Sequence, residues 1–146
     1  MTIDESLLTI SDFRGIGYRP LVDYGAWRVA VLRYIDELLP ENIASMQRHD
    51  ETDEVFVLLA GRCILFIGGD GETVERIQAA DMQPYQLYNV RRGAWHTHTL
   101  DPDAHLLIIE NRDTSGANSP LAALTEPQRA ELVRLTAALW EEYKQG

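Results

Sequence analysis

The sequence predicts an all-β fold of the jelly-roll type, in which two sheets close into a barrel, followed by one C-terminal α-helix. The first observation is an apolar period of two, which is typical of strands and runs through most of the chain. The second is a set of turn-forming residues that interrupt this period at regular intervals, as expected for many short strands. The third is a change to helical spacing near the C-terminus.

The barrel is expected at residues 20–112, within one domain that spans residues 1–146. Its strands are expected at residues 27–32, 43–49, 54–60, 63–67, 73–77, 86–90, 95–100 and 105–110. Only Gly61 and Arg62 separate the third strand from the fourth, so we expect these two strands to form a hairpin. The glycine-rich stretch at residues 68–71 predicts a turn, because glycine adopts positive φ without strain.

The helix is expected at residues 125–144. Thr125 stands at the N-cap, Pro127 lies in the first turn, and Gln128 occupies the capping-box position. The apolar stripe of this helix is formed by Leu132, Leu135, Leu139 and Tyr143. The barrel wall or a second subunit would have to cover this stripe, and the sequence leaves both possibilities open.

Composition narrows the class of protein. Acidic residues outnumber basic residues by 23 to 13, which gives a net charge of −10. Such a surface repels phosphate backbones and anionic lipids, so we expect neither nucleic acid nor a membrane as a partner. Cys63 is the single cysteine and the first residues lack the pattern of a signal peptide, so we expect a cytoplasmic protein.

Two short patterns carry the possible chemistry. In the first, Gln47 and His49 are two residues apart, on one face of an extended segment, and Glu54 and Gly61 follow. This pattern resembles the first conserved motif of the cupin superfamily, with Gln47 in the place of that motif's first histidine. Gly93 and His96 resemble the second cupin motif, with Arg91 in the place of its proline. The resemblance covers residues 47–96 and implies a cupin-type double-stranded β-helix barrel.

The cupin resemblance also implies a metal site and a homodimer associated through sheet edges. The ligands would be His49, Glu54 and His96, with Gln47 or His98 as the fourth. Imidazole and carboxylate suit one divalent ion of zinc, iron, manganese or nickel. The alternative is a barrel without metal, whose histidines form hydrogen bonds or transfer protons.

Within the cupins, residues 46–49, 56–59 and 92–97 are most similar to ureidoglycolate lyases. The polar pair is exchanged, because those enzymes carry Glu where Gln47 stands here and Gln where Glu54 stands here. The resemblance implies an enzyme that breaks a carbinol C–N bond and releases glyoxylate and urea. Its base would be His49 or His96, and its acid would be Glu54 with a pKa raised by burial.

The substrate of such a lyase is a small organic acid, so a cation is needed to bind its carboxylate. Arg28, Arg33 and Arg91 are the candidates, with Gln47 and His98 as further contacts. Arg28 and Arg33 cannot both face inward on a regular strand. Two other functions stay open at this point. One is a metal-dependent dioxygenase or isomerase, and the other is a cupin that binds a ligand without catalysis.

Overall fold

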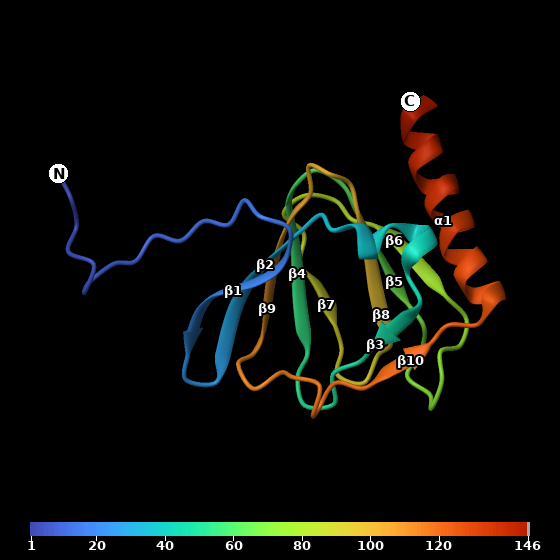
Figure 1. The fold of residues 1–146 in the computed structure, drawn as a ribbon, viewed down its shortest axis with the longest axis horizontal. Helices are drawn as coiled ribbons and strands as arrows, with labels where there is room; N and C mark the ends of the chain where they lie inside the picture. The colour runs from blue at the N-terminus through green and yellow to red at the C-terminus, as the bar shows by residue number, and fades with distance from the viewer. Residues whose placement is uncertain (146) are drawn as a thin grey trace.

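The structure is a computed structural model that describes the backbone of residues 1–145 and the side chains of residues 1–141. Two antiparallel sheets face each other and α1 lies along one of them (Figure 1). The strands in the described range are β1 (Gly17–Tyr24), β2 (Trp27–Arg33), β3 (Ser45–Gln47), β4 (Glu54–Ala60), β5 (Cys63–Ile67), β6 (Gln78–Asp81), β7 (Tyr88–Val90), β8 (His96–Leu100), β9 (His105–Asn111) and β10 (Leu121–Ala123). The helices are η1 (Asp36–Leu38), η2 (Pro40–Asn42) and α1 (Glu126–Gln145).

Sheet A has the strand order β1-β2-β9-β4-β7, and sheet B has the order β10-β3-β8-β5-β6. Most neighbouring strands in each sheet are far apart in the sequence, as in a jelly roll. The predicted fold class is therefore confirmed as a cupin-type barrel with a C-terminal helix.

The predicted hairpin between residues 54–60 and 63–67 is wrong. Strand β4 pairs with β7 and β9 in sheet A, whereas β5 pairs with β6 and β8 in sheet B. The turn at Gly61 has a φ of 68°, and a Cβ there would lie 2.4 Å from the backbone nitrogen of Ala104. The two-residue connection therefore carries the chain across the barrel rather than back along β4.

Three other elements differ from the expectation. The strand expected at 73–77 is displaced to β6, and its buried Val74 and Ile77 belong to a loop that packs against α1. Strand β1 is not predicted because a bulge between Pro20 and Val22 interrupts its period of two. Strand β10 is three residues long and pairs with β3, which is distant in the sequence.

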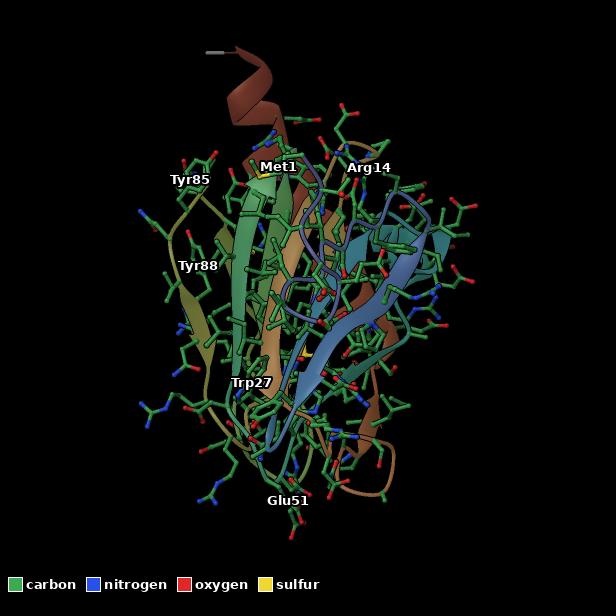
Figure 2. All side chains as sticks on the ribbon, turned by 90° about the vertical axis from the view of Figure 1, so that its left-hand side faces the viewer. Met1, Arg14, Trp27, Glu51, Tyr85 and Tyr88 are labelled. Atoms are coloured by element: carbon green, nitrogen blue, oxygen red, sulfur yellow. The ribbon has the colours of Figure 1, made fainter. Side chains whose placement is uncertain are left out.

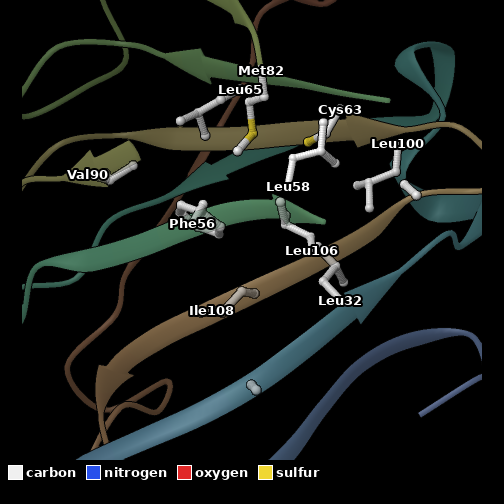
Figure 3. Packing of buried hydrophobic residues seen from close by; sticks show 12 residues of the cluster. Leu32, Phe56, Leu58, Cys63, Leu65, Met82, Val90, Leu100, Leu106 and Ile108 are labelled. Atoms are coloured by element: carbon white, nitrogen blue, oxygen red, sulfur yellow. The ribbon is translucent and has the colours of Figure 1, made fainter. Parts of the chain in front are cut away.

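Two apolar clusters hold these layers together. The first fills the space between the sheets and includes Phe56, Leu58 and Leu106, each at most 1% exposed (Figure 3). The second lies between sheet B and α1, where Leu132 is completely buried beside Trp95. The helix thus packs on its own barrel. Tyr143, which was expected to continue its apolar stripe, lies outside the residues whose side chains are described.

In the described part of the chain, none of the helices has the length and apolarity that a membrane span requires.

Candidate functional site

His49, Glu54 and His96 meet inside the barrel. The Nε2 atoms of His49 and His96 lie 3.0 Å and 2.9 Å from the same oxygen, Oε1 of Glu54. All three residues are buried, with at most 6% of their surface exposed. The backbone explains this convergence, because Gln47 pairs with His96 in sheet B and the amide of Gly93 donates to the carbonyl of His49 over 2.8 Å. The two segments that resemble cupin motifs are thus joined by main-chain hydrogen bonds.

The second ring nitrogens orient both imidazoles. His96 Nδ1 lies 3.0 Å from the carbonyl of Ala94, which can only accept, so this nitrogen carries a proton. His49 Nδ1 lies 2.7 Å from the hydroxyl of Ser119, which can donate or accept. With Nδ1 protonated, the 2.9 Å contact between Nε2 and Oε1 of Glu54 requires a second proton on Nε2 or a metal cation between the two atoms.

The donor set fits a divalent metal ion. His49, Glu54 and His96 each offer one ligand atom, and these atoms lie within 4.8 Å of one another. Two imidazoles and a carboxylate suit zinc, iron, manganese or nickel. The contacts from Nδ1 to Ala94 and Ser119 are the outer contacts that commonly fix metal-binding histidines. The cluster can thus hold a metal, as the cupin resemblance implies.

The expected raised pKa of Glu54 is wrong. Burial is the largest single influence and acts to raise this pKa, but the hydrogen bonds with His49, His96 and Glu110 act in the opposite direction and prevail. The pKa of Glu54 therefore falls well below its usual value. Glu54 is ionised at neutral pH and does not act as the proton donor.

Glu110 and Tyr18 complete the cluster, and neither was among the predicted site residues. Burial, followed by the hydrogen bond and the charge of Glu54, raises the pKa of Glu110 to about 8. Tyr18 donates its hydroxyl hydrogen to Oε1 of Glu110 over 2.6 Å. Burial and the adjacent Glu110 raise the pKa of Tyr18, so the phenol stays neutral. Glu54 and Glu110 are thus a hydrogen-bonded pair that shares one proton.

A sequence signal for Glu110 exists in strand β9. Leu106 and Ile108 face the barrel interior, and the period of two places Glu110 on the same face. A carboxylate at an inward position of an otherwise apolar strand is unusual enough to mark a site. Tyr18 has no such signal, because its partner is 92 residues away.

The cluster opens into a cavity of about 310 Å³. One wall is apolar and includes Leu32, Phe56 and Ile108. Arg28, on the same inward face of β2 as Leu32, and the loop residues 114–116 and 119 also line the cavity. Arg28 is held there by Asp23, whose Oδ1 lies 2.9 Å from Nε. The cavity therefore combines an apolar wall, a carboxyl pair and one cation.

The structure places two further predicted residues at this cavity. Gln47 lines it and donates from Nε2 to the carbonyl of Ser119 over 3.1 Å. His98 also lines it, but it is not one of the three residues grouped as a metal site. Burial lowers the pKa of His98 to about 4, and its Nδ1 has no hydrogen-bond partner among the described residues. His98 is therefore a neutral imidazole beside the cluster.

The three candidate arginines are separated by strand parity and by distance. Arg28 shares the inward face of β2 with Ala30 and Leu32 and lines the cavity. Arg33 has the opposite parity and lies on the outer face of sheet A. Arg91 lies 3.4 Å from Asp53, with 81% of its side chain exposed, and does not line the cavity. The structure thus brings one of the three arginines to the site.

Comparison with known proteins supports the fold. No protein-family model and no curated protein sequence matches the chain. A nucleoside dehydratase from Streptomyces, Pac13, has a TM-score of 0.54 at 9% identity, over 82% of this chain and 87% of its own. The capsular polysaccharide assembling protein CapF from Staphylococcus aureus has a TM-score of 0.57 at 11% identity, over 77% of this chain and 34% of CapF.

A cupin-2 domain containing protein from Shewanella frigidimarina is 19% identical, over 68% of this chain and 85% of its own, with a TM-score of 0.48. The TM-scores above 0.5 of Pac13 and CapF show a shared fold, and at such low identity they transfer no activity. The chemistry has to be argued from the cavity itself.

Proposed function

We propose that this chain is a small-molecule enzyme that cleaves a small organic acid by proton transfer, with ureidoglycolate as the first substrate to test. The observation that carries the proposal is the Glu54–Glu110 pair, which places an ionised carboxylate and a protonated carboxyl side by side in one cavity. A lyase that breaks a carbinol C–N bond needs one base and one acid. The choice of ureidoglycolate comes from the sequence resemblance.

Each residue has a role in this reaction. Glu54 accepts the hydroxyl proton as the carbonyl of glyoxylate forms, and Glu110 donates its proton to the nitrogen as the C–N bond breaks. The proton then returns from Glu54 to Glu110 through their mutual hydrogen bond, so none is consumed. Arg28 binds the carboxylate of the substrate. The hydrogen bonds with His49 and His96 keep Glu54 ionised between turnovers.

Glyoxylate release from ureidoglycolate tests this proposal. We expect Glu110→Gln to lower kcat by a factor of about 100 to 10,000, because the amide cannot supply the proton. Arg28→Ala should mainly raise KM, because it removes the cation that binds the substrate carboxylate. Arg91→Ala is the matched control, since Arg91 is exposed and lies outside the cavity. If the native protein releases no glyoxylate above the buffer rate, with or without zinc, iron, manganese or nickel, ureidoglycolate lyase activity is excluded.

The grouping of three ligand atoms within 4.8 Å of one another favours a second candidate, a metal-dependent cupin enzyme such as a dioxygenase or isomerase. His49, Glu54 and His96 would hold the ion. A divalent ion there would act as a Lewis acid on a substrate oxygen. Metal analysis of gently purified protein is the test, with one ion per chain expected and loss of the ion in His96→Ala. A protein without metal would exclude this candidate and leave the proton-transfer reaction open.

A further inference from the structure

In β1, the edge strand that faces the viewer in Figure 2, a bulge turns two polar side chains to the inner face of sheet A. Tyr18 lies opposite Leu32 of β2, which faces the barrel interior. Asp23 lies opposite Arg28, which also faces inward. Tyr18 and Asp23 are five residues apart, so on a regular strand they would face opposite sides of the sheet. The one-residue bulge at Leu21 shifts the register and brings both side chains to the same side.

These two side chains hold Arg28 from two directions. Oδ1 of Asp23 lies 2.9 Å from Nε of Arg28. The hydroxyl of Tyr18 interacts with the Arg28 guanidinium and donates its hydrogen to Oε1 of Glu110 over 2.6 Å. An arginine side chain without partners samples many rotamers, so two partners restrict it strongly. A guanidinium has five N–H donors, and two partners therefore leave donors for a ligand in the cavity.

The Tyr18 hydroxyl also limits the distance between Arg28 and Glu110. Both groups interact with this one oxygen atom, so they lie about two hydrogen-bond lengths apart at most. The positive charge of Arg28 is close enough to act on Glu110 as well. A substrate whose carboxylate binds Arg28 must therefore hold the nitrogen that Glu110 protonates close to that carboxylate. The shortest such acid carries the nitrogen on carbon 2, and each added methylene lengthens the span by about 1 Å.

We propose that Tyr18 and Asp23 are positioning residues that hold Arg28 beside Glu110, so that the site selects acids substituted at carbon 2 over acids substituted at carbon 3. The inference rests on the proposed function, because it takes Arg28 as the group that binds the carboxylate and Glu110 as the acid. Misplacement of a reacting group by about 1 Å can lower a rate about a hundredfold, so a fixed spacing is a sufficient basis for selection. Neither Tyr18 nor Asp23 has to touch the reacting atoms in this role.

Binding of two acids that the proposed reaction cannot cleave tests the inference without turnover. Ureidoacetate is ureidoglycolate without its hydroxyl group, and 3-ureidopropionate is one methylene longer than ureidoacetate. Titration calorimetry with the full chain measures the dissociation constant of each acid. We expect the native protein to bind ureidoacetate at least about tenfold more tightly than 3-ureidopropionate. Equal affinities, or no binding of either acid, would overturn the inference.

Two variants each remove one partner of Arg28. Tyr18→Phe removes the hydroxyl that links Arg28 to Glu110, and Asp23→Asn removes the negative charge beside Nε. We expect each variant to reduce the ratio of the two dissociation constants at least about threefold, because Arg28 is no longer held beside Glu110. A loss of folded protein alone would leave this ratio at its native value. An unchanged ratio in either variant would overturn the inference.

The matched controls change the same chemical groups outside the cavity. Tyr34→Phe removes a hydroxyl that donates to Asp36. Asp12→Asn removes the charge of a carboxylate that lies 2.9 Å from Nε of Arg14. Both controls should keep the native ratio. Glyoxylate release together with equal binding of the two acids would overturn this inference alone, whereas selective binding without glyoxylate release would overturn the lyase reaction alone.

Discussion

Two glutamates in one cavity are in different protonation states because their hydrogen-bond partners differ. Glu54 is hydrogen-bonded to two imidazoles, and these interactions keep its pKa below the usual value despite burial. Glu110 has a carboxylate and a neutral phenol as its neighbours, and burial raises its pKa to about 8. A pair of groups with separated pKa values is the arrangement that lets one site supply both an acid and a base.

The raised pKa of Glu110 predicts a pH dependence of stability. A buried group that binds its proton more tightly in the folded state stabilises the fold below its unfolded pKa, and this contribution is lost as the pH rises through about 8. Glu110→Gln keeps a neutral side chain at every pH. We therefore expect the free energy of unfolding to fall less in Glu110→Gln than in the native protein between pH 5 and pH 9, by on the order of 1 to 3 kcal/mol.

Chelator-treated protein is the sample for this measurement, because a bound cation would favour the ionised carboxyl. Urea unfolding at several pH values measures the difference, and Glu72→Gln, at an exposed position, is the control. Parallel pH profiles for Glu110→Gln and the native protein would contradict the proton-sharing pair.

The sequence predicts the part of this site that depends on local spacing. His49, Glu54 and His96 could be identified because strand alternation and two short motifs place them on one face. The charge state of Glu54 could not be predicted, since it depends on which groups surround it after folding. Tyr18 could not be predicted either, because only the pairing of β1 with β2 brings it to the interior.

At the scale of elements, the crossing from β4 to β5 depends on Gly61. We expect Gly61→Ala to destabilise the protein by several kcal/mol, because a Cβ would lie 2.4 Å from the nitrogen of Ala104 and the φ of 68° is also unfavourable. Gly25→Ala is the control, since Gly25 has a positive φ of 55° and nothing within 4 Å of its Cβ position. It should lose about 1–2 kcal/mol. Equal losses of unfolding free energy in the two variants would show that crowding at the crossing is unimportant.

The packing of α1 on sheet B gives a second prediction at this scale. Leu132 lies on the face of α1 that packs on sheet B and is completely buried. Leu132→Ala should lower the free energy of unfolding by about 2–5 kcal/mol. Val133 is the adjacent residue and is 42% exposed, so Val133→Ala should change stability by about 0.5 kcal/mol or less. Thermal unfolding of the two variants measures the contrast. A small effect of Leu132→Ala would mean that the helix contributes little to the fold.

Strand periodicity predicts most elements and fails where pairing is distant or irregular. Continuous runs of β-forming apolar residues, such as those in β4, β5 and β9, are recovered within one residue at either end. The bulge in β1 hides its alternation, and β10 is too short to show one. The period of two also does not indicate which strands pair with one another. For this reason the short link at Gly61 suggests a hairpin, although both partners of each strand lie elsewhere.

At the scale of the whole molecule, the two sheets are covered unequally. Sheet B is buried on both faces, between the inner apolar cluster and α1. The helix α1 does not pack on the outer face of sheet A, where Val29, Val55 and Ile109 stay partly exposed although Val31 is buried. Parallel rows of aliphatic side chains on an uncovered sheet favour association over solubility of the monomer. A second copy of the chain would supply a layer on this face.

If a second copy covers the outer face of sheet A, the stability of the folded chain depends on association. A partner that binds only the folded chain stabilises it by mass action, so the midpoint of thermal unfolding should rise with protein concentration. We expect this rise in the native protein and in Val133→Lys, which changes an exposed position of α1. In Ile109→Lys, which places a charge on the outer face of sheet A, we expect a midpoint that is independent of concentration. Scanning fluorimetry or calorimetry over a hundredfold concentration range, at one fixed scan rate, measures the effect. If the midpoint of the native protein does not change over that range, folding does not depend on the second copy, and sheet A is stable with its outer face exposed.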